Sequence, residues 1–544
     1  MPKVNRQTAG KIGLFSAIMI IFSTLIGIGI FFKNFSVFNN NHGNPWGILI
    51  SWIIAIILVM CTALSFCEIS SCKTPGKSDG LGGWAQRFCG HGFGRYSKVG
   101  YALFFYALDT FVIMFFVGEA CLNCFAELGG GAGSVNFGSA TVFYIFLIGA
   151  ALYAIFAIVN VLANNAMTKF SNAVGIIKFI PIIAVVILGI TFGAIKGGGL
   201  WNNNWFSPAG HEPKLPQSTP DLVGIIISLP SILFVYEGYL IIGNIAGDMK
   251  NPEKNVPLAV VIAIVIAAVL YVLITIGCIT AGTGNVYELM EFCFGNGTTL
   301  TKVFTTIMSI FIFISVLGVL NAMTFTGMRA FQSNCERGEL FRSKRLLNKK
   351  PGNNLYAGAV SFTIVICIWW AIMVIPSCVL NTDRIIDGMS NMMILGIYIV
   401  YAVLLCCGLH NRRTNKVEVR KIKGFTGFCI VAIITCFFMI SFCSVYQFII
   451  NPIIGAREHG WSGVYEDCGW GLFIKCKSAL VPWPTDENGY LLGFNYWQAM
   501  VIYWVLLTFM MLCPFINDLM IKWWDKSNHQ CLIWQKPNKQ IVLI

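Results

Sequence analysis

Residues 25–31 read Leu-Ile-Gly-Ile-Gly-Ile-Phe, and residues 234–239 read Phe-Val-Tyr-Glu-Gly-Tyr. Each stretch lies inside an apolar run that is long enough to cross a lipid bilayer. Glycines at this depth predict an interrupted helix, and unwound backbone is tolerated there only where protein buries it or a polar cavity receives it. Two breaks, one early and one about five helices later, therefore predict a site inside the membrane at which two broken helices meet.

The composition places the chain in a membrane. Of its 544 residues, 56% are hydrophobic and only 11% are charged, with a mean hydropathy of +0.73; soluble domains carry roughly 25% charged residues. The first apolar run lacks a small-residue cleavage pattern, so we expect a retained helix rather than a removed signal peptide. The apolar runs predict twelve spans of roughly 18–27 residues, with approximate centres at Ile21, Ile56, Thr110, Leu152, Ala184, Leu233, Ala268, Phe313, Ile368, Ile397, Thr435 and Leu507.

The predicted fold is all-α, a polytopic membrane protein with twelve transmembrane helices. Because broken spans 1 and 6 are five spans apart, the first ten spans suit two inverted five-helix repeats, with two further helices after them. We expect residues 1–10 to form a cytoplasmic N-terminus, 11–410 the ten-helix core, 411–520 two additional helices with an external loop at about 450–497, and 521–544 a cytoplasmic C-terminus.

The basic residues are distributed unevenly between the predicted loops. The formal net charge is +13, and most of the 37 Lys and Arg fall on the side of the N-terminus, in clusters at 73–98, 329–350 and 412–423. Cytoplasmic loops of membrane proteins carry such an excess, so we expect both termini inside the cell and the protein in the plasma membrane. This asymmetry explains the basic balance without a nucleic acid partner, and attraction to anionic lipid of the inner leaflet is a secondary effect.

Several motifs follow the first break in order along the chain. Residues 26–31 read Ile-Gly-Ile-Gly-Ile-Phe, residues 63–69 read Ala-Leu-Ser-Phe-Cys-Glu-Ile before Pro-Gly at 75–76, and the exit of span 6 at 247–257 reads Gly-Asp-Met-Lys-Asn-Pro-Glu-Lys-Asn-Val-Pro. A turn at 336–340 reads Glu-Arg-Gly-Glu-Leu. Together they resemble signatures of the amino acid–polyamine–organocation (APC) superfamily of permeases over most of the first 430 residues. The resemblance implies a leucine-transporter-like fold with discontinuous helices 1 and 6 and an amino acid bound between them.

Three positions depart from the pattern of that superfamily. Ile28 stands where a small polar residue is frequent, Tyr239 replaces a Trp, and Asp248 replaces a Glu. These changes are compatible with the same backbone arrangement, but they leave undetermined which amino acid is the substrate.

The two breaks offer partners for both charged ends of an amino acid. Gly27 and Gly29 let helix 1 open, and the half-helix that begins there presents free N–H groups to a carboxylate. Carbonyl groups at 24–26 and 234–236 can accept hydrogen bonds from the ammonium, and the resemblance implies that the Phe234 ring closes over the ligand. Glycines that merely pack against a neighbouring helix are the alternative. The predicted substrate-binding residues are Thr24, Ile26, Gly27, Ile28, Gly29, Phe234, Val235, Tyr236, Glu237 and Tyr239.

Ionisable side chains inside spans are costly and mark function by default. The resemblance implies that Lys178 in span 5 replaces a bound sodium ion beside span 1, which favours proton coupling or exchange; a lysine that reaches the inner surface is the alternative. Asp109, the second predicted coupling residue, can line the same cavity or pair with Lys178. Glu237 can bind a cationic side chain, carry a proton or cap the broken helix. Two acids at this depth favour basic amino acids as substrates.

The resemblance implies a secondary active transporter of amino acids across the plasma membrane that works by alternating access, and two alternative functions remain open. One is a sodium-coupled amino acid symporter, against which Lys178 argues, and the other is a membrane sensor with the same fold that does not transport. No enzyme chemistry, cofactor or metal site is expected, since the six His are scattered and no nucleophile elbow or phosphate-binding loop occurs. A partner subunit is left undecided.

Two features of the predicted external segments concern covalent modification. Cys468 and Cys476 can form a disulfide or remain free thiols. Asn34 and Asn296 begin Asn-x-Ser/Thr sequons and are expected on the external side, where a glycosylating host could modify them.

Overall fold

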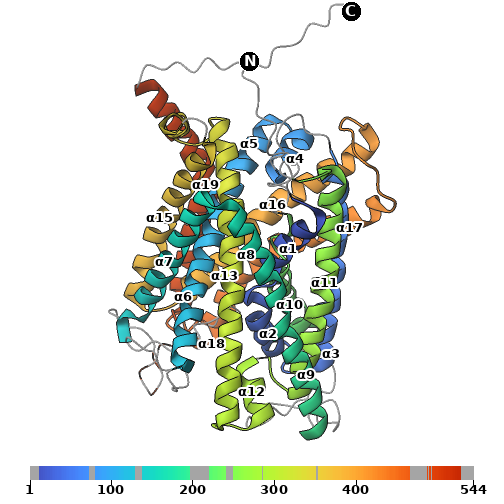
Figure 1. Cartoon of the computed structure of the whole chain (residues 1–544), viewed down its shortest axis with the longest axis vertical. Coiled ribbons are helices and arrows are strands. Elements are labelled where there is room, and N and C mark those ends of the chain that lie inside the picture. The colour runs from blue at the N-terminus through green and yellow to red at the C-terminus, as the bar shows by residue number, and fades with distance from the viewer. Residues whose placement is uncertain are drawn as a thin grey trace, which may run out of the picture.

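The computed structural model describes residues 12–72, 80–128, 138–196, 220–240, 249–284, 286–350, 353–465 and 493–527, with residues 485, 487, 489 and 491. Within these residues the chain is helical, and its β-structure is limited to isolated bridges such as the one between Ile12 and Met249. The helices form one bundle (Figure 1). The predicted all-α class is confirmed. Cys468 and Cys476 lie outside the described residues.

Among the described residues, 10 helical stretches are long and apolar enough to cross a membrane. Large apolar side chains such as Leu147, Ile183 and Ile434 are exposed on their outer faces, as lipid contact requires. The ten stretches are α3 (Pro45–Ser70), α5 (His91–Gly100) continuing into α6 (Ala107–Leu128), α7 (Thr141–Leu162), α8 (Asn164–Ile177) with α9 (Phe179–Lys196), α11 (Pro252–Ala281), α13 (Thr299–Glu336), α15 (Asn354–Leu380), α16 (Arg384–Thr414), α17 (Phe425–Ser441) continuing to α18 (Asn451–His459), and α19 (Tyr496–Ser527).

Shorter helices complete the bundle. Three of them, α1 (Leu14–Leu25), α2 (Ile28–Asn40) and α10 (Leu222–Val235), belong to the broken segments. The others, α4 (Gly80–Cys89), α12 (Val286–Phe294) and α14 (Ser343–Lys349), connect longer helices.

The first predicted interruption is confirmed. Helix α1 ends at Leu25 and α2 begins at Ile28, while Ile26 and Gly27 between them have extended backbone conformations. The second helix, α10, ends at Val235 and is followed by a turn in which Gly238 has a φ of +97°. Residues 241–248 beyond this turn lie outside the described residues.

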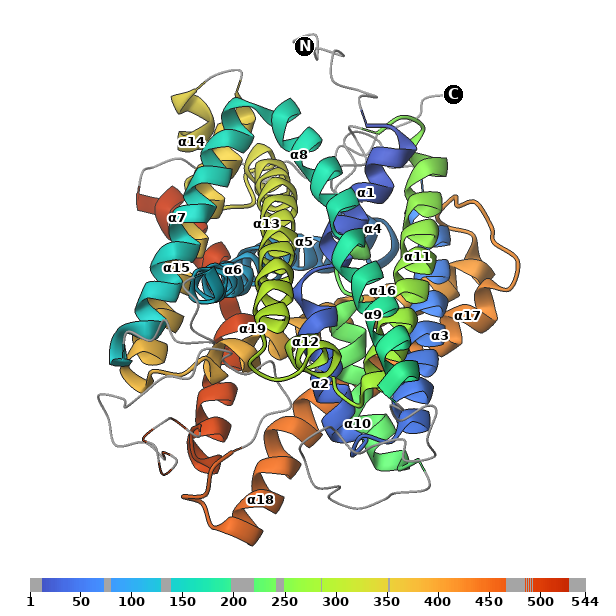
Figure 2. The ribbon, with the colours of Figure 1, turned by 60° about the horizontal axis from the view of Figure 1, so that its bottom comes forward.

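The broken helices occupy the middle of the bundle. Figures 1 and 2 show α1 and α2 between α13 on one side and α3 and α11 on the other. Helix α10 packs on both α2 and α3, and α1 packs on α11, α13 and α8. Long continuous helices therefore surround the two points at which the backbone opens.

Glycine holds several pairs of helices at backbone contact, and α6 with α7 and α9 with α11 are the two closest examples. A Cβ atom added to Gly118 of α6 would lie 2.0 Å from the carbonyl oxygen of Ile145 in α7. A Cβ atom added to Gly189 of α9 would lie 2.2 Å from the carbonyl oxygen of Gly277 in α11. Small residues let membrane helices approach this closely. We call these two contacts the glycine seams.

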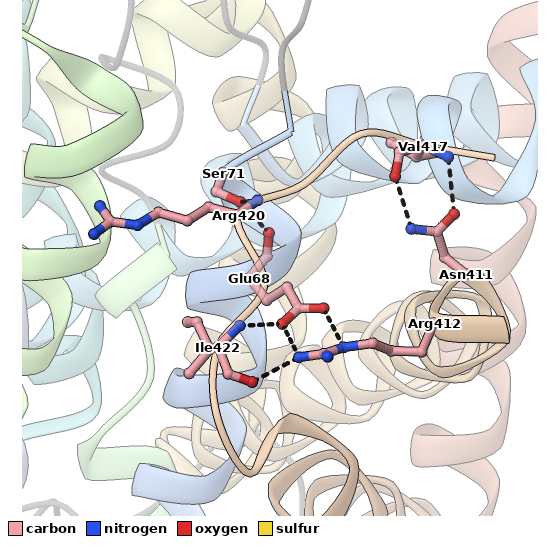
Figure 3. Close-up of polar contacts among 7 residues, drawn as sticks. All are labelled: Glu68, Ser71, Asn411, Arg412, Val417, Arg420 and Ile422. Atoms are coloured by element: carbon pink, nitrogen blue, oxygen red, sulfur yellow. Dashed lines mark hydrogen bonds and ion pairs between the residues drawn. The ribbon is translucent and has the colours of Figure 1, made fainter. Parts of the chain in front are cut away.

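A polar cluster joins the end of α3 to the end of α16 and the loop that follows it (Figure 3). Arg412 donates from Nε and Nη2 to the two carboxylate oxygens of Glu68, at 2.7 and 2.6 Å. The Ile422 amide donates to Glu68 Oε2 at 2.7 Å, and the Arg420 amide donates to Ser71 Oγ at 2.8 Å. Glu68 is only 3% exposed, so this carboxylate is a buried charge with its partners supplied.

The structure corrects one expectation about modification. Asn34 lies in α2 and is buried, with its Oδ1 accepting a hydrogen bond from the Thr275 hydroxyl at 3.3 Å. It is therefore not an external acceptor, because an oligosaccharide needs an exposed side chain. Asn296 is exposed, in agreement with its expected surface position.

Candidate functional site

A small cavity opens where the two broken helices meet. Its volume is about 60 Å³, room for a few water molecules. Predicted residues on its wall are Thr24, Gly27, Gly29, Asp109, Phe234, Val235 and Glu237, and the rest of the wall is Leu25, Phe105, Ile113, Val316, Val319, Met323 and Met393. Residues from α1, α2, α6, α10, α13 and α16, distant in sequence, are thus brought together.

Close contacts between the breaks explain the glycines. A Cβ atom on Gly27 would lie 2.8 Å from Val319 Cγ2 of α13, and one on Gly29 would lie 3.3 Å from Val235 Cγ2 of α10. A residue larger than glycine at position 27 would therefore push α2 away from α13. The first break needs glycine for this close approach as well as for the opening of the helix.

Protein groups already occupy two of the carbonyls released at the first break. The Tyr271 hydroxyl donates to the Leu25 carbonyl at 2.7 Å, and the Lys178 ammonium donates to the Ile26 carbonyl. Ser315 Oγ also approaches the Ile26 carbonyl, at 3.5 Å. These contacts satisfy buried backbone groups that would otherwise be costly. The Leu25 and Ile26 carbonyls are therefore already engaged before any ligand enters.

The opposite side of the first break has a different character. Helix α2 begins at Ile28, and its N-cap residue is Gly27, which has no side chain that could accept from the first N–H groups. The first N–H groups of a helix lack partners within the helix and carry partial positive charge. With Gly27 and Gly29 on the cavity wall, the start of α2 is suited to a carboxylate.

Two carboxyl groups face the same small space. Asp109 of α6 and Glu237 of the turn after α10 both line the cavity, and Asp109 is close enough to be affected by the charge of Glu237. The Tyr401 hydroxyl lies 3.3 Å from Glu237 Oε2, and Tyr398 is a second hydrogen-bonding neighbour of this carboxyl group. None of the described residues on the cavity wall is basic. The arrangement suits a ligand that brings positive charge with it.

Lys178 is placed next to the break rather than in the cavity wall. It is 1% exposed, and its ammonium contacts the Ile26 carbonyl. Because the chain buries this side chain inside the bundle, the alternative of a lysine that reaches the membrane surface does not apply. In the described residues Asp109 lies near Glu237 rather than in an ion pair with Lys178.

The structure also reveals a second buried lysine, which the sequence analysis did not single out. Lys33 of α2 is 1% exposed, and its ammonium lies 5.3 Å from the centre of the Phe234 ring. An ammonium over an aromatic face is stabilised by the electron-rich ring. The available signal was the position of Lys33 within an apolar run, one helical turn beyond Gly29.

Four predicted residues are not among the described residues that line the cavity. Tyr236 packs against Trp52 and Tyr271, with ring centroids 6.5 and 5.0 Å away. Ile26 contributes its carbonyl to Lys178, and Tyr239 is buried near Glu237, but neither lines the described cavity. Ile28 provides the first residue of α2.

Two groups of apolar residues on the cavity wall were not predicted from the sequence. Phe105 and Ile113 flank Asp109 at intervals of four residues on one face of the third span. Val316, Val319 and Met323 lie at intervals of three and four residues on α13. Both groups have helical spacing, but nothing in the sequence distinguishes them from the many other apolar faces.

Comparison with known proteins adds independent findings. A family model described as amino acid permease matches residues 12–462. The serine/threonine exchanger SteT of Bacillus subtilis is 24% identical over 423 residues, covering 75% of this chain and 85% of that protein. An uncharacterized protein of Mycoplasma pneumoniae is 21% identical over 500 residues, covering 82% and 86%. The uncharacterized amino acid permease YtnA of Bacillus subtilis is 32% identical over 105 residues, covering 18% of this chain and 20% of its own length.

Proposed function

The chain belongs to the amino acid permease family, and from that premise we propose that it is a secondary active transporter that works by alternating access in the plasma membrane. It is a multi-pass membrane transporter of amino acids rather than an enzyme. In our proposal the ten continuous helical stretches and the two broken segments make twelve crossings, and the first ten form two inverted repeats. Both termini then lie in the cytoplasm, as the positions of the basic clusters favour.

The proposed binding mode uses the two sides of the first break differently. The uncapped start of α2 receives the α-carboxylate of the substrate, because its free N–H groups border the cavity. Asp109 and Glu237 bind the positively charged groups of the substrate. Phe234, which lines the cavity and contacts the Lys33 ammonium through its ring, acts as the gate over the ligand.

The coupling we propose is exchange or proton symport rather than sodium symport. The observation that carries this proposal is the ammonium of Lys178 on the Ile26 carbonyl at the break. An ammonium at this point supplies the positive charge that a sodium ion would otherwise bring to the unwound carbonyl. Lys178 and Asp109 are the groups through which proton transfer would be coupled to transport.

For the substrate, we favour basic amino acids. The cavity wall contains two carboxyl groups and, among its described residues, no basic side chain. A basic amino acid carries a second positive charge, which can pair with the second carboxyl group. A neutral amino acid has no such charge and would leave that carboxyl group without a partner. A small neutral substrate is the second candidate, because the cavity of about 60 Å³ is narrow and the relative SteT is named as a serine/threonine exchanger.

Transport by reconstituted protein tests these proposals. Proteoliposomes are loaded with unlabelled lysine, arginine, serine or threonine, and uptake of the labelled amino acids is measured with and without proton and sodium gradients. We expect lysine or arginine uptake to be accelerated by internal amino acid or by a proton gradient, and not by sodium. A matched negative control is Gly27→Leu, whose side chain would collide with Val319 across the cavity.

Each outcome bears on a different part of the proposal. Strict dependence on sodium would overturn the role given to Lys178. Uptake restricted to serine and threonine would replace the basic substrate with the neutral one. If ligand binding occurs without uptake or exchange of any amino acid, the chain is a sensor and the transport proposal is wrong.

A further inference from the structure

A second and much larger cavity shares no lining residue with the cavity between the broken helices. It has a volume of about 630 Å³, within the range of small-molecule sites, and is formed by α13, α14, α15 and α19. Its walls are mostly apolar, with Leu346, Ile364, Ile368, Trp369, Phe509 and Met520 among the residues that form them. We call this cavity the outer crevice. Figure 2 shows α14 near α15 at the edge of the bundle.

The outer crevice faces the surroundings of the bundle rather than its interior. Ile364 and Ile368 of α15 are 51% and 48% exposed, and Met520 of α19 is 39% exposed. Both helices are among those that can cross a membrane, so these exposed apolar side chains face lipid. Hydrocarbon chains therefore have direct access to the crevice.

Three cations stand at one end of the same crevice. Arg342, Arg345 and Lys349 belong to α14 and the residue before it, line the crevice and are exposed. None of the described residues that line the crevice is acidic. Apolar walls that end in a group of cations are complementary to a molecule with hydrocarbon chains and an anionic head.

Arg342 is held in position by its surroundings. Its φ of +55° is a left-handed conformation that is costly for a residue other than glycine or asparagine. Its guanidinium lies 4.1 Å from the centre of the Trp524 ring and 5.2 Å from that of Phe341. Stacking of this kind fixes a guanidinium while leaving its N–H groups available to phosphate oxygens.

We propose that the outer crevice binds an anionic glycerophospholipid from the bilayer, with its acyl chains between α15 and α19 and its phosphate against Arg342, Arg345 and Lys349. The crevice is separate from the cavity between the broken helices, so this site does not depend on the substrate or on the coupling proposed above. A bound lipid would join α14 to α15 and α19 and stabilise the folded protein by mass action.

Native mass spectrometry of the full chain in detergent tests the proposal. The probes are dioleoylphosphatidylglycerol, zwitterionic dioleoylphosphatidylcholine, and inorganic phosphate as a free anion without chains. The charge variant combines Arg342→Gln, Arg345→Gln and Lys349→Gln. The matched control removes the same charge from the exposed end of α16 and the loop after it, through Arg413→Gln, Lys416→Gln and Lys421→Gln.

We expect the charge variant to bind phosphatidylglycerol at least about tenfold more weakly, because each surface cation contributes to attraction of an anionic lipid. The control variant should bind within about twofold of the unchanged protein, because none of its three cations lines the crevice. A second variant, Ile368→Trp, fills the crevice from its exposed side and should reduce the number of bound molecules of both lipids. Gel filtration and far-ultraviolet circular dichroism establish that each variant is folded.

Three results would overturn the proposal. They are equal phosphatidylglycerol binding by the charge and control variants, equal affinity for the two lipids in the unchanged protein, and inorganic phosphate binding as tightly as the lipid. The last result would mean a free-anion site, and Ile368→Trp would then have no effect. Because lipid binding is measured without transport, failure here leaves the transport proposal standing, and the reverse is also true.

Discussion

Two buried glutamates in this protein lie in opposite surroundings. Glu68 receives a two-point contact from the Arg412 guanidinium and a third hydrogen bond from the Ile422 amide. Glu237 accepts hydrogen bonds from tyrosine hydroxyls and shares its cavity with a second carboxyl group, Asp109. The first carboxylate has its counter-charge in the folded chain, whereas the cavity around the second contains no cation among its described wall residues.

The difference indicates what each region is for. A buried charge that is fully partnered holds its neighbours in one arrangement, and removal of its partner is strongly destabilising. A buried acid without a fixed counter-charge lowers stability, so its retention points to a ligand or a proton that arrives during function. We therefore expect substitutions to separate stability from transport, depending on the region they change.

The largest effect is expected for Arg412→Met. This change leaves Glu68 buried without its guanidinium, which costs about 3 kcal/mol of stability. Thermal unfolding in detergent, followed by gel filtration, should show a marked loss relative to Arg413→Met, which changes the exposed neighbouring arginine. The double variant with Glu68→Gln should recover part of that loss. If Arg412→Met is as stable as Arg413→Met, the Glu68 cluster does not hold the helices together.

The second effect concerns Glu237→Gln. The amide keeps the shape and removes the charge, so uptake of a basic amino acid should fall roughly 10- to 100-fold, equivalent to about 2 kcal/mol. The unfolding temperature should stay the same or rise, in contrast to Arg412→Met. The control is Glu291→Gln on the exposed surface of α12. Equal transport of basic and neutral amino acids by Glu237→Gln would remove the basis for a cationic substrate.

A somewhat smaller effect is expected for Lys178→Met, which removes the ammonium from the Ile26 carbonyl. Loss of one charged hydrogen bond of about 1.5 kcal/mol would slow exchange roughly tenfold and weaken its dependence on a proton gradient. Lys169→Met, at an exposed position of α8, the helix that ends just before Lys178, serves as the control. Unchanged exchange and unchanged proton dependence would assign Lys178 a purely structural place in the bundle.

The smallest effect is expected for Lys33→Met, which removes a cation from the Phe234 ring but keeps a side chain of similar length. An ammonium–ring contact contributes about 1 kcal/mol, so uptake should change by roughly fivefold while binding of substrate changes less. The exposed Lys302→Met is the comparison. A change in binding affinity without a change in transport rate would place Lys33 in the binding site instead of at the gate.

The sequence was sufficient for features that depend on local backbone chemistry. Apolar runs of bilayer length predicted the helical class, and Gly27 with Gly29 predicted the opening between α1 and α2. Asp109 and Glu237 could be singled out because acids inside apolar spans are rare. In each case the signal is contained within one helix.

Features created by packing between distant helices could not be predicted in the same way. Lys33 and Asn34 resemble residues at a membrane edge, and only the fold of α2 into the bundle buries them. Glu68 and Arg412 are 344 positions apart, so no local pattern relates them. The Leu25 and Ile26 carbonyls were expected to await a ligand, whereas Tyr271 and Lys178 arrive from other helices to occupy them.

The glycine seams have a mechanical consequence for any moving part of this protein. Side chains between two helices act as a compliant layer that can shift by changing rotamers, but α6 and α7 meet at Gly118, and α9 and α11 meet at Gly189, with no such layer between their backbones. We therefore expect each pair of helices to move as one rigid body. Changes of backbone shape should then be concentrated in the segments that connect such rigid pairs. A single added methyl group at either glycine seam, as in Gly118→Ala, would push the two helices apart and change the angle at which they pack.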